Sequence, residues 1–193
     1  MTTIASIVEG QGDELAVPVL LRRIVSERFS GSGPVIIERP HRLPRGRMLK
    51  EEHLGRAVEL QRRRVQQDGS GGVLVLLDSD DDDAEELCAQ VLSVARAAGT
   101  IEVVVAVREF EAWFLAAMQS LTSHRSVKLT ALDVEHPEAR RGAKETLSRH
   151  MLQPYRETLH QPAFCACIDI NSAERGSSSF RHLIQAVGRL VVA

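Results

Sequence analysis

The chain has 193 residues, of which 44% are hydrophobic and 26% are charged, and this balance is typical of a soluble globular protein. Its 24 Lys and Arg residues against 26 Asp and Glu residues give a formal net charge of −2, which argues against a protein that coats nucleic acid by bulk charge alone. With three cysteines, no signal-like N-terminus and no apolar run long enough to span a bilayer, the sequence predicts a cytoplasmic protein without disulfides and excludes the secreted and membrane classes.

Apolar segments that are typical of β-strands alternate with segments whose apolar residues recur at helical spacing. The expected strands are 3–8, 35–37, 73–77 and 103–107. The expected helices comprise 15–25, with Asp13 as the predicted N-cap, and then 54–65, 84–98 and 112–121. Regular alternation of this kind predicts an α/β fold with a mainly parallel sheet flanked by helices.

The last third of the chain has a less regular pattern. Residues 122–137 are typical of a loop, 141–159 are mostly helical in spacing, 164–170 alternate like a half-buried strand, and 180–192 form an amphipathic helix. We therefore expect a core over residues 1–121 and a C-terminal α/β elaboration over residues 122–193, packed on the same domain.

Acidic residues directly follow three of the expected strands. Glu9 follows the first strand, Asp78 and Asp80 follow the third, and Glu109 and Glu111 follow the fourth. In open α/β sheets, ligands bind outside the carboxyl ends of the strands, so these side chains are candidate site residues. While the chain remains extended, Asp78 and Asp80 point the same way, and Glu9 joins them if the first and third strands are neighbours.

Carboxylates that converge on one partly dry rim repel one another, and a hard cation such as Mg²⁺ or Mn²⁺ relieves that repulsion. Such a metal can polarise a phosphoryl oxygen and activate water, and a pair about 4 Å apart can clamp an in-line displacement at phosphorus. The pattern therefore predicts a divalent-metal site for phosphoryl chemistry, centred on Glu9, Asp78 and Asp80.

Two of these motifs resemble the Toprim signature, which is the strand-ending Glu and the Asp-x-Asp of topoisomerases, bacterial primases, recombination-repair proteins and OLD-type nucleases. They are Val8-Glu9-Gly10 and Leu76-Leu77-Asp78-Ser79-Asp80. The chain is more similar still to a bacterial Toprim-like family of unknown function that is often encoded beside an ATPase. That resemblance covers nearly the whole chain, and its motifs are Glu9-Gly10-Gln11…Glu14, Arg108-Glu109-Phe110-Glu111-Ala112-Trp113-Phe114, Gly142-Ala143-Lys144-Glu145 and Ser178-Ser179-Phe180.

The resemblance implies a Toprim/Rossmann-like core and a role for each acidic residue. Glu9 would be a general acid/base or a metal ligand, and Asp78 and Asp80 would bind the divalent metal. Glu109 or Glu111 would complete the metal's shell, as in the nucleases. Strand passage by a topoisomerase mechanism is not expected, because the chain has no separate domain with a nucleophilic tyrosine. Its single tyrosine, which lies in a Gln-Pro-Tyr-Arg turn, has no expected catalytic role.

A basic stretch precedes the second acidic motif. Residues 39–64 hold nine Lys or Arg against three Glu, a local net charge of +6. Because no aromatic residues interleave with these cations, they suit phosphate contact more than base stacking. The predicted phosphate contacts are Arg42, Arg45 and Arg47, together with Lys144. The expected substrate is a nucleic acid, DNA in preference to RNA.

Several residues also have a purely structural interpretation. The residues Asp81–Asp83 suit a solvated helix start, with Asp82 or Asp83 as N-cap. Glu14 fits a second metal ligand and a helix-start acid equally well, and Lys144 also fits a surface helix. The aromatic residues of 110–114 are expected in the core, as are Cys165 and Cys167, whose spacing is not that of a structural zinc site.

Three functions therefore remain open from the sequence. The leading one is a Mg²⁺- or Mn²⁺-dependent Toprim-type nuclease that works with a partner ATPase, in defence or DNA processing. The second is a non-catalytic Toprim-like module that binds nucleic acid, a nucleotide or an ATPase. The third is a phosphatase of the haloacid-dehalogenase type, which is disfavoured because its Asp-x-Asp follows the first strand of its core.

Overall fold

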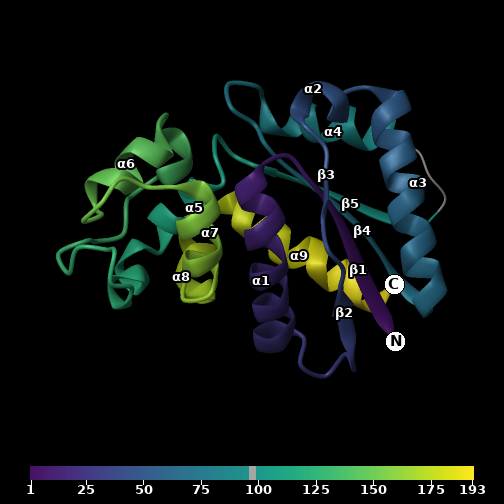
Figure 1. Ribbon diagram of the computed structural model, residues 1–193, viewed down its shortest axis with the longest axis horizontal. Helices are drawn as coiled ribbons and strands as arrows, with labels where there is room; N and C mark the ends of the chain where they lie inside the picture. Colours follow the sequence, from purple (N-terminus) through teal and green to yellow (C-terminus); the bar gives the residue numbers. More distant parts are fainter. Residues whose placement is uncertain (96–98) are drawn as a thin grey trace.

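The computed structural model describes residues 1–95 and 99–193. Within these residues a parallel sheet of five strands forms the centre of the molecule (Figure 1). The strands are β1 (Thr2–Val8), β2 (Val35–Ile37), β3 (His41–Arg42), β4 (Ser70–Asp78) and β5 (Thr100–Ala106). Their order is β2-β1-β4-β5, and β3 pairs with β1 beyond the end of β2. The predicted fold class, a mainly parallel sheet flanked by helices, is confirmed.

Helices cover both faces of this sheet. On one face lie α1 (Gln11–Arg28) and α9 (Ser178–Val192), and on the other lie α3 (Glu51–Asp68) and α4 (Ala84–Val94) (Figure 1). The side chains of β4 alternate between the two cores, with Leu74 and Leu76 on the α1 side and Val73 and Val75 on the α3 side. A strand buried on both faces is a continuous apolar run, which is why this strand is visible in the sequence. Residues 96–98, the end of one predicted helix, lie outside the described residues.

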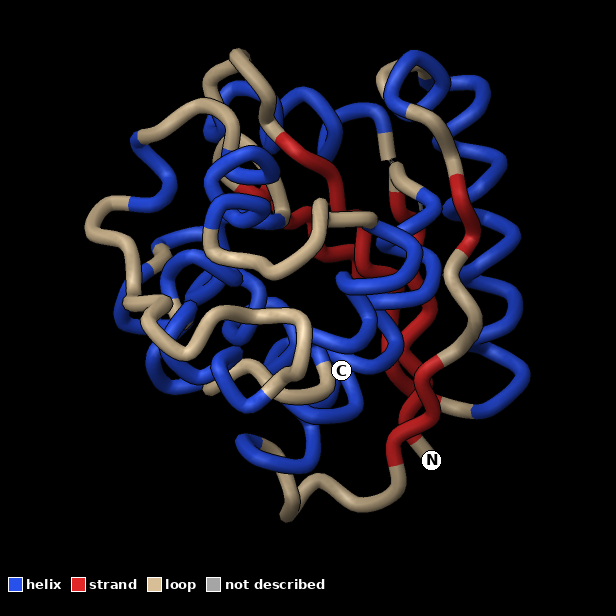
Figure 2. The backbone as a smooth tube through the Cα atoms, turned by 60° about the vertical axis from the view of Figure 1, so that its left-hand side comes forward, coloured by secondary structure: helices blue, strands red, loops and turns tan. Residues whose placement is uncertain are grey.

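A block of short helices packs beside α1 and the sheet (Figure 2). Its elements are α5 (Glu111–Ala116), η1 (Met118–Ser123), η2 (Pro137–Ala139), α6 (Ala143–Arg149), α7 (Glu157–Cys165) and α8 (Ile170–Gly176). The remaining helix, α2 (Arg45–Met48), lies between β3 and α3. Because α9 returns from this block to pack on β4 and β5, the two expected parts of the chain are in contact, and the boundary at residue 121 stays a prediction.

The strand expected over residues 164–170 is wrong, since this segment holds the end of α7, a turn and the start of α8. Alternation of apolar residues suggested a strand, but the buried side chains are Phe164, Cys165 and Ile168, whose spacing is helical. The two cysteines are free, and Cys165 is buried in the core as expected. The single long helix expected over 141–159 is instead α6, an irregular segment and the first turn of α7.

Local signals in the sequence place other elements correctly. Asp83 is the N-cap of α4, and its carboxylate accepts hydrogen bonds from the backbone N–H groups of Glu85 and Glu86. Phe110 and Trp113 are 2% and 0% exposed and pack with their ring centroids 4.4 Å apart, which confirms them as core residues. Among the described residues, no helix has the length and apolar character needed to cross a bilayer.

The close pairing of β1 with β4 depends on a glycine. Gly71 has a φ of 119°, and a Cβ atom there would overlap the backbone carbonyl of Thr3 on β1. We predict that Gly71→Ala lowers the free energy of unfolding, by about 1–3 kcal/mol from the backbone conformation alone. Gly55→Ala is the matched control, because Gly55 lies inside α3 with open space around it and alanine is the better helix former. Urea unfolding should show opposite signs for the two variants, and equal destabilisation would contradict this account.

Candidate functional site

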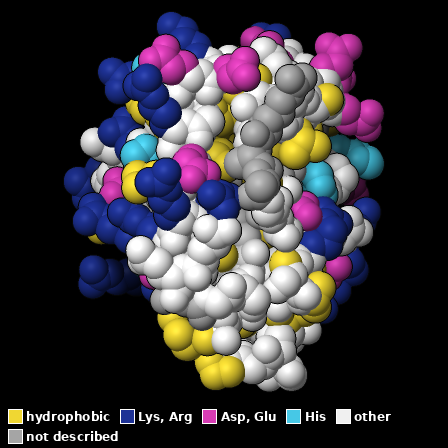
Figure 3. All heavy atoms as spheres, turned by 90° about the vertical axis from the view of Figure 1, so that its right-hand side faces the viewer, with side chains coloured by type: hydrophobic (Ala, Val, Ile, Leu, Met, Phe, Trp, Pro, Cys, Tyr) yellow, Lys and Arg dark blue, Asp and Glu magenta, His cyan; other side chains and the backbone are white. Residues whose placement is uncertain are grey.

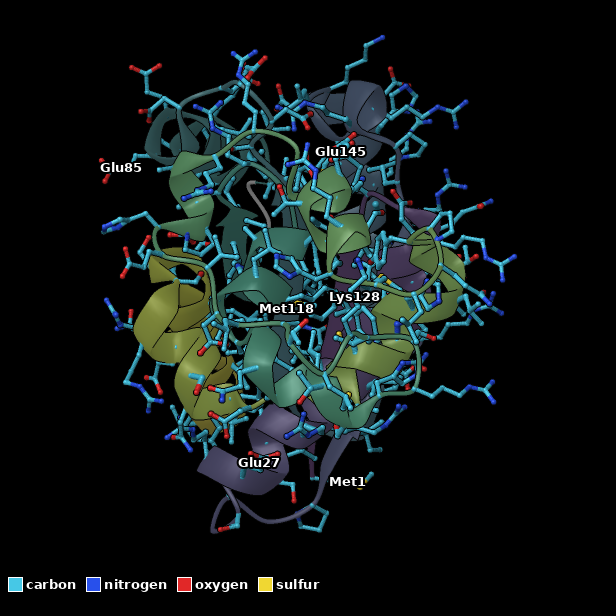
Figure 4. All side chains as sticks on the ribbon, turned by 90° about the vertical axis from the view of Figure 1, so that its left-hand side faces the viewer. Met1, Glu27, Glu85, Met118, Lys128 and Glu145 are labelled. Atoms are coloured by element: carbon cyan, nitrogen blue, oxygen red, sulfur yellow. The ribbon has the colours of Figure 1, made fainter. Side chains whose placement is uncertain are left out.

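The acidic residues predicted from the sequence lie at the carboxyl ends of three neighbouring strands. Val8 pairs with Leu76, and Asp78 pairs with Ala106, so the ends of β1, β4 and β5 lie side by side. Glu9 is expected to join Asp78 if the first and third predicted strands are neighbours. These strands are β1 and β4, and they pair directly. Figure 4 shows Glu85 and Glu145, near the starts of α4 and α6, toward this end of the molecule and Met1 and Glu27 toward the other.

A small pocket of about 100 Å³ lies at this edge of the sheet, and we call it the acidic pocket. It is lined by Glu9, Gly10, Asp13, Asp78, Phe110, Glu111, Lys144, Glu157 and Gln161. Five of these side chains carry carboxyl groups and one is basic. The lining comes from the turn after β1 and from α1, β4, the start of α5, α6 and α7, so the helical block closes the pocket against the sheet.

Two of the carboxyl groups are held by backbone hydrogen bonds. Oδ1 of Asp78 accepts from the N–H of Phe110 at 2.9 Å, which ties the end of β4 to the start of α5. Asp13 accepts from the N–H of Gly10 at 2.8 Å and from Nε2 of Gln161 at 2.7 Å. The prediction of Asp13 as the N-cap is wrong, because α1 begins at residue 11 with Gly10 as its N-cap. Asp13 lies in the first turn, where its carboxylate can bond back to the cap and still face the pocket.

Two other carboxyl groups have buried oxygen atoms without a hydrogen bond. They are Oε2 of Glu9 and Oε2 of Glu111, and Glu111 as a whole is only 1% exposed. The hydroxyl of Tyr155 is also buried and lies near the Glu111 carboxylate, and burial and that carboxylate raise the pKa of this tyrosine. Buried acceptors in native proteins are normally satisfied, so these oxygens mark the place where a proton, a cation or a polar ligand is stabilised.

Burial shifts the ionisation of the whole group. It raises the pKa of Asp78 well above its ordinary value, and the neighbouring Glu111 and Asp13 carboxylates raise it further. Burial also raises the pKa of Glu111, to about 7, against the opposing effect of Lys144. The pKa of Glu9 is raised by burial too, although Arg45 lowers it in part. Burial alone would lower the pKa of Lys144, but the carboxylates of Glu111 and Glu157 raise it overall, so this lysine is charged.

Asp80 does not share the acidic pocket with Asp78. The expectation that both point the same way needed an extended chain, but β4 ends at Asp78 and Asp80 adopts a left-handed conformation with φ of 50°. Arg108, which follows β5, is also left-handed, with φ of 66°, and its carbonyl accepts from the N–H of Asp80 at 3.0 Å. Non-glycine residues in this region are strained, and paired strain of this kind is concentrated at functional sites.

The two turns create a second, outer cavity of about 190 Å³ beside the acidic pocket. Its lining residues are Asp80, Asp81, Arg108, Glu109 and Arg141. The structure thus separates Glu109 from Glu111: Oε2 of Glu109 accepts from the backbone N–H of Lys144 at 3.0 Å, whereas Glu111 lines the acidic pocket. Of the predicted metal ligands, Glu9, Asp78 and Glu111 are brought together, and Asp80 and Glu109 lie in the outer cavity.

The predicted phosphate contacts reach the site in different ways. Lys144 lines the acidic pocket and pairs with Glu157 at 2.6 Å. Arg42 is exposed, and its Nε donates to the carbonyl of Glu9 at 3.3 Å. Arg45 contacts the carboxylates of Glu9, Asp80 and Asp82 at the ends of β1 and β4, which we call the acidic rim, and its Nη2 lies 2.5 Å from Oδ2 of Asp82. Arg47 is exposed on α2.

The rest of the basic stretch lies away from the pocket, on α3. Arg62 and Arg63 of this helix pair with Glu59 at 2.8 and 2.9 Å. On the α3 side of the molecule, Lys and Arg side chains gather along one flank with acidic side chains among them (Figure 3). The arginines of α3 therefore belong to a solvated helix face, as clustered charges commonly do. Arg42 and Arg45 connect the basic stretch with the acidic rim.

Three polar side chains that line the pocket were not predicted as site residues: Asp13, Glu157 and Gln161. Asp13 is four residues after Glu9, but its pattern is also that of an ordinary helix start. Glu157 and Gln161 are four apart on one face of α7, which packs closely along α1. A Cβ atom at Gly12 would overlap the side chain of Gln161, so this glycine permits the close approach of the two helices. Glu14, an alternative ligand, instead pairs with Arg39 at 2.8 Å.

Among the described residues, no group of three or more His, Cys, Asp or Glu side chains is arranged to hold a metal ion. The donor chemistry of the acidic pocket nevertheless fits a hard cation, since it offers carboxylate oxygens, two of them buried and without a hydrogen bond. Mg²⁺ commonly binds through one or two carboxylates and keeps waters in its remaining positions, so a preformed cage of three ligands is not required.

The family comparison covers this entire site. The family model described as Domain of unknown function (DUF4276) matches residues 8–188. The chain belongs to this family. The match to DUF4276 includes every residue that lines the acidic pocket.

Among solved structures, the chain is similar to the C-terminal region of the Burkholderia pseudomallei OLD protein, at 14% sequence identity and a TM-score of 0.49, over 99% of each chain. No curated protein matches the chain. Membership of DUF4276 carries no assigned chemistry, so the function has to be argued from the acidic pocket itself.

The buried position of Glu111 predicts a specific pH dependence of stability. Its pKa is raised from 4.5 to about 7, so between these two pH values the unfolded state ionises while the folded state keeps its proton. Stability from this group is therefore complete below pH 4.5 and is lost as the pH rises to about 7. We predict that Glu111→Gln, measured by urea unfolding in EDTA, is more stable than the wild type at pH 8 by up to about 3 kcal/mol. At pH 4 the difference should vanish, and a constant difference at both pH values would contradict the assignment.

Proposed function

We propose that this protein is a divalent-metal-dependent phosphoesterase that hydrolyses nucleic-acid phosphodiesters, DNA in preference to RNA. The observation that carries the proposal is the convergence of Glu9, Asp78 and Glu111 with Lys144 in one pocket at the carboxyl ends of parallel strands. Structural acids at a helix start would remain in water, whereas Glu111 is 1% exposed and unsatisfied at Oε2. Buried and electrostatically coupled carboxyl groups in a cleft are typical of sites that bind or transform a ligand.

The metal of this proposal is Mg²⁺ or Mn²⁺, held by Asp78 with Glu111 or Glu9. When bound, such an ion polarises a phosphoryl oxygen and lowers the pKa of a water molecule. Asp78 is the best-placed ligand, because its other oxygen is fixed by the N–H of Phe110 and the carboxylate cannot rotate freely. Glu111 supplies the buried oxygen that most needs a positive charge beside it.

Glu9 is the residue suited to general acid/base catalysis. Burial raises its pKa above the ordinary value, although Arg45 opposes the shift, and a raised pKa favours the uptake of a proton by this carboxylate. Lys144 provides the positive charge next to a substrate phosphate, because it lines the pocket and is held charged by its acidic neighbours. Arg42 and Arg47 are exposed at the β3–α2 side and would contact flanking phosphates.

Removing either central carboxylate should abolish cleavage. We predict that Glu9→Gln and Asp78→Asn each lower the rate of Mn²⁺-dependent cleavage of plasmid, linear or single-stranded DNA by about a hundredfold or more, because each removes a charge that acts directly at the reacting phosphate. The measurement is a gel assay with and without Mn²⁺ at equal concentrations of folded protein.

Glu86→Gln is the matched control, since Glu86 belongs to the same acidic run but lies exposed in the first turn of α4. This variant should keep the wild-type rate. Cleavage that survives Asp78→Asn or Glu9→Gln at the wild-type level would overturn the assignment of the site.

The exposed arginines should contribute to DNA binding through phosphate charge. We predict that Arg42→Ala and Arg47→Ala each reduce the slope of log affinity against log salt concentration by about 1. Fluorescence anisotropy with a short DNA in EDTA measures this without cleavage. Arg63→Ala removes an equal charge from α3, where Arg63 pairs with Glu59, and should leave the slope unchanged. Equal slopes for all variants would exclude the proposed contact of Arg42 and Arg47 with DNA phosphates.

A non-catalytic binding module is the second candidate, and one observation favours it. No group of three metal-ligating side chains is preformed among the described residues, and Lys144 and Arg45 already provide positive charge beside the carboxylates. Absence of cleavage with Mn²⁺ on every DNA and RNA substrate, together with retained DNA binding, would favour this alternative.

A partner ATPase belongs to the proposal as well. We propose that the protein acts with such an ATPase in the cytoplasm, in defence or DNA processing, on the basis of the sequence resemblance described above. Cleavage that appears only when a purified partner ATPase and ATP are added would support a partner-dependent nuclease.

A further inference from the structure

Arg45 of α2 lies across the outer side of the acidic rim. Its Nη1 donates to the carbonyl of Asp78 at 2.5 Å, and its Nη2 lies 2.5 Å from Oδ2 of Asp82. The same guanidinium is 3.9 Å from Oε2 of Glu9 and 3.9 Å from Oδ2 of Asp80. One guanidinium thus lies within 3.9 Å of three carboxylates that follow β1 and β4.

The guanidinium is held in this position from two sides. The bonds to Asp78, Asp82 and the carbonyl of Ser79 fix its head, and its side chain is only 20% exposed. Its helix, α2, is anchored by Leu43 and Met48, which are buried in the core on the α3 side of the sheet. A planar group with this many fixed bonds is preorganised, in contrast to a lysine on a flexible stem.

Glu9 and Asp80 are two carboxylates that face the same guanidinium, and a divalent ion beside them would need the space that Arg45 occupies. Glu9 offers there a buried oxygen without a hydrogen bond, and Asp80 offers an exposed carboxylate that is turned out of the acidic pocket. A metal ion bound to either oxygen at about 2.1 Å would stand against the Arg45 guanidinium, and like charges so close repel strongly. The two cations therefore exclude each other.

We propose that Arg45 fills the place of a second metal ion with its own guanidinium, so that the protein binds at most one divalent ion, in the acidic pocket. The inference rests on the proposed function for the identity of that first ion. In this arrangement the Arg45 guanidinium balances the charge of Glu9 and Asp80 in place of a metal ion. Removal of the arginine should therefore create a new metal site.

The number of bound ions tests this directly. Mn²⁺ is titrated into the metal-free protein, with calorimetry giving the stoichiometry and electron paramagnetic resonance counting free ions. We expect Arg45→Gln to bind one more ion than the wild type, with an affinity at least about tenfold above any weak second binding to the wild type. Arg45→Lys, which keeps a cation, should retain the wild-type number. Arg56→Gln removes an equal charge from α3, where Arg56 pairs with Glu52, and should also retain it.

Each outcome separates this inference from the proposed function. An extra ion in Arg45→Gln supports the inference even if the wild type binds none, although the proposed metal dependence would then fail. An unchanged number of ions in Arg45→Gln, or two ions in the wild type, overturns the inference and leaves a metal-dependent nuclease intact. If Arg45→Gln does not fold by circular dichroism, Arg45→Met replaces it, because methionine keeps an unbranched apolar stem without the charge. That variant should also bind one more ion than the wild type, and an unchanged number would again overturn the inference.

Discussion

Repulsion among carboxyl groups at the ends of β1 and β4 is the constraint on which the rest of the structure depends. Two unit charges 4 Å apart near a protein surface interact by about 4 kcal/mol, a large fraction of the net stability of a domain. Parallel pairing of β1 with β4 brings Glu9 next to Asp78, and α1 and α5 add Asp13 and Glu111. Such a group is stable only if protons or positive charges enter it, and raised pKa values show that burial favours the protonated forms.

Positive charge reaches the carboxylates from two segments that are far apart in the sequence. Arg45 comes from the segment between β3 and α3, and Lys144 comes from α6 in the helical block, roughly a hundred residues later. The left-handed residues Asp80 and Arg108 turn the chain so that Asp80 lines the outer cavity, 3.9 Å from Arg45, whereas Asp78 and Glu111 line the acidic pocket with Lys144. The nearly neutral net charge of the protein therefore conceals two acid–base clusters that lie against each other.

The parts of this arrangement that depend on local sequence could be predicted. The apolar run of β4 and the acidic residue that ends it are contiguous in the chain, and parallel strands must align their carboxyl ends, so Asp78 and Glu9 were predictable as neighbours. The separation of Asp80 from Asp78 was not, because it depends on a backbone conformation that an aspartate rarely adopts. Gln161 and Glu157 were also beyond prediction, since their role depends on the packing of α7 along α1.

The glycine at position 12 has a consequence for the size of the pocket. Because α7 rests on α1 where Gly12 has no side chain, the distance between these helices is set by the backbone of α1 itself. Any larger residue would act as a spacer that moves Glu157 and Gln161 outward and lets more water between the carboxylates. A wider opening would weaken the electrostatic coupling among the acids and admit bulkier ligands. The aperture of the pocket is thus encoded by the absence of one methyl group, far in sequence from the helix that it positions.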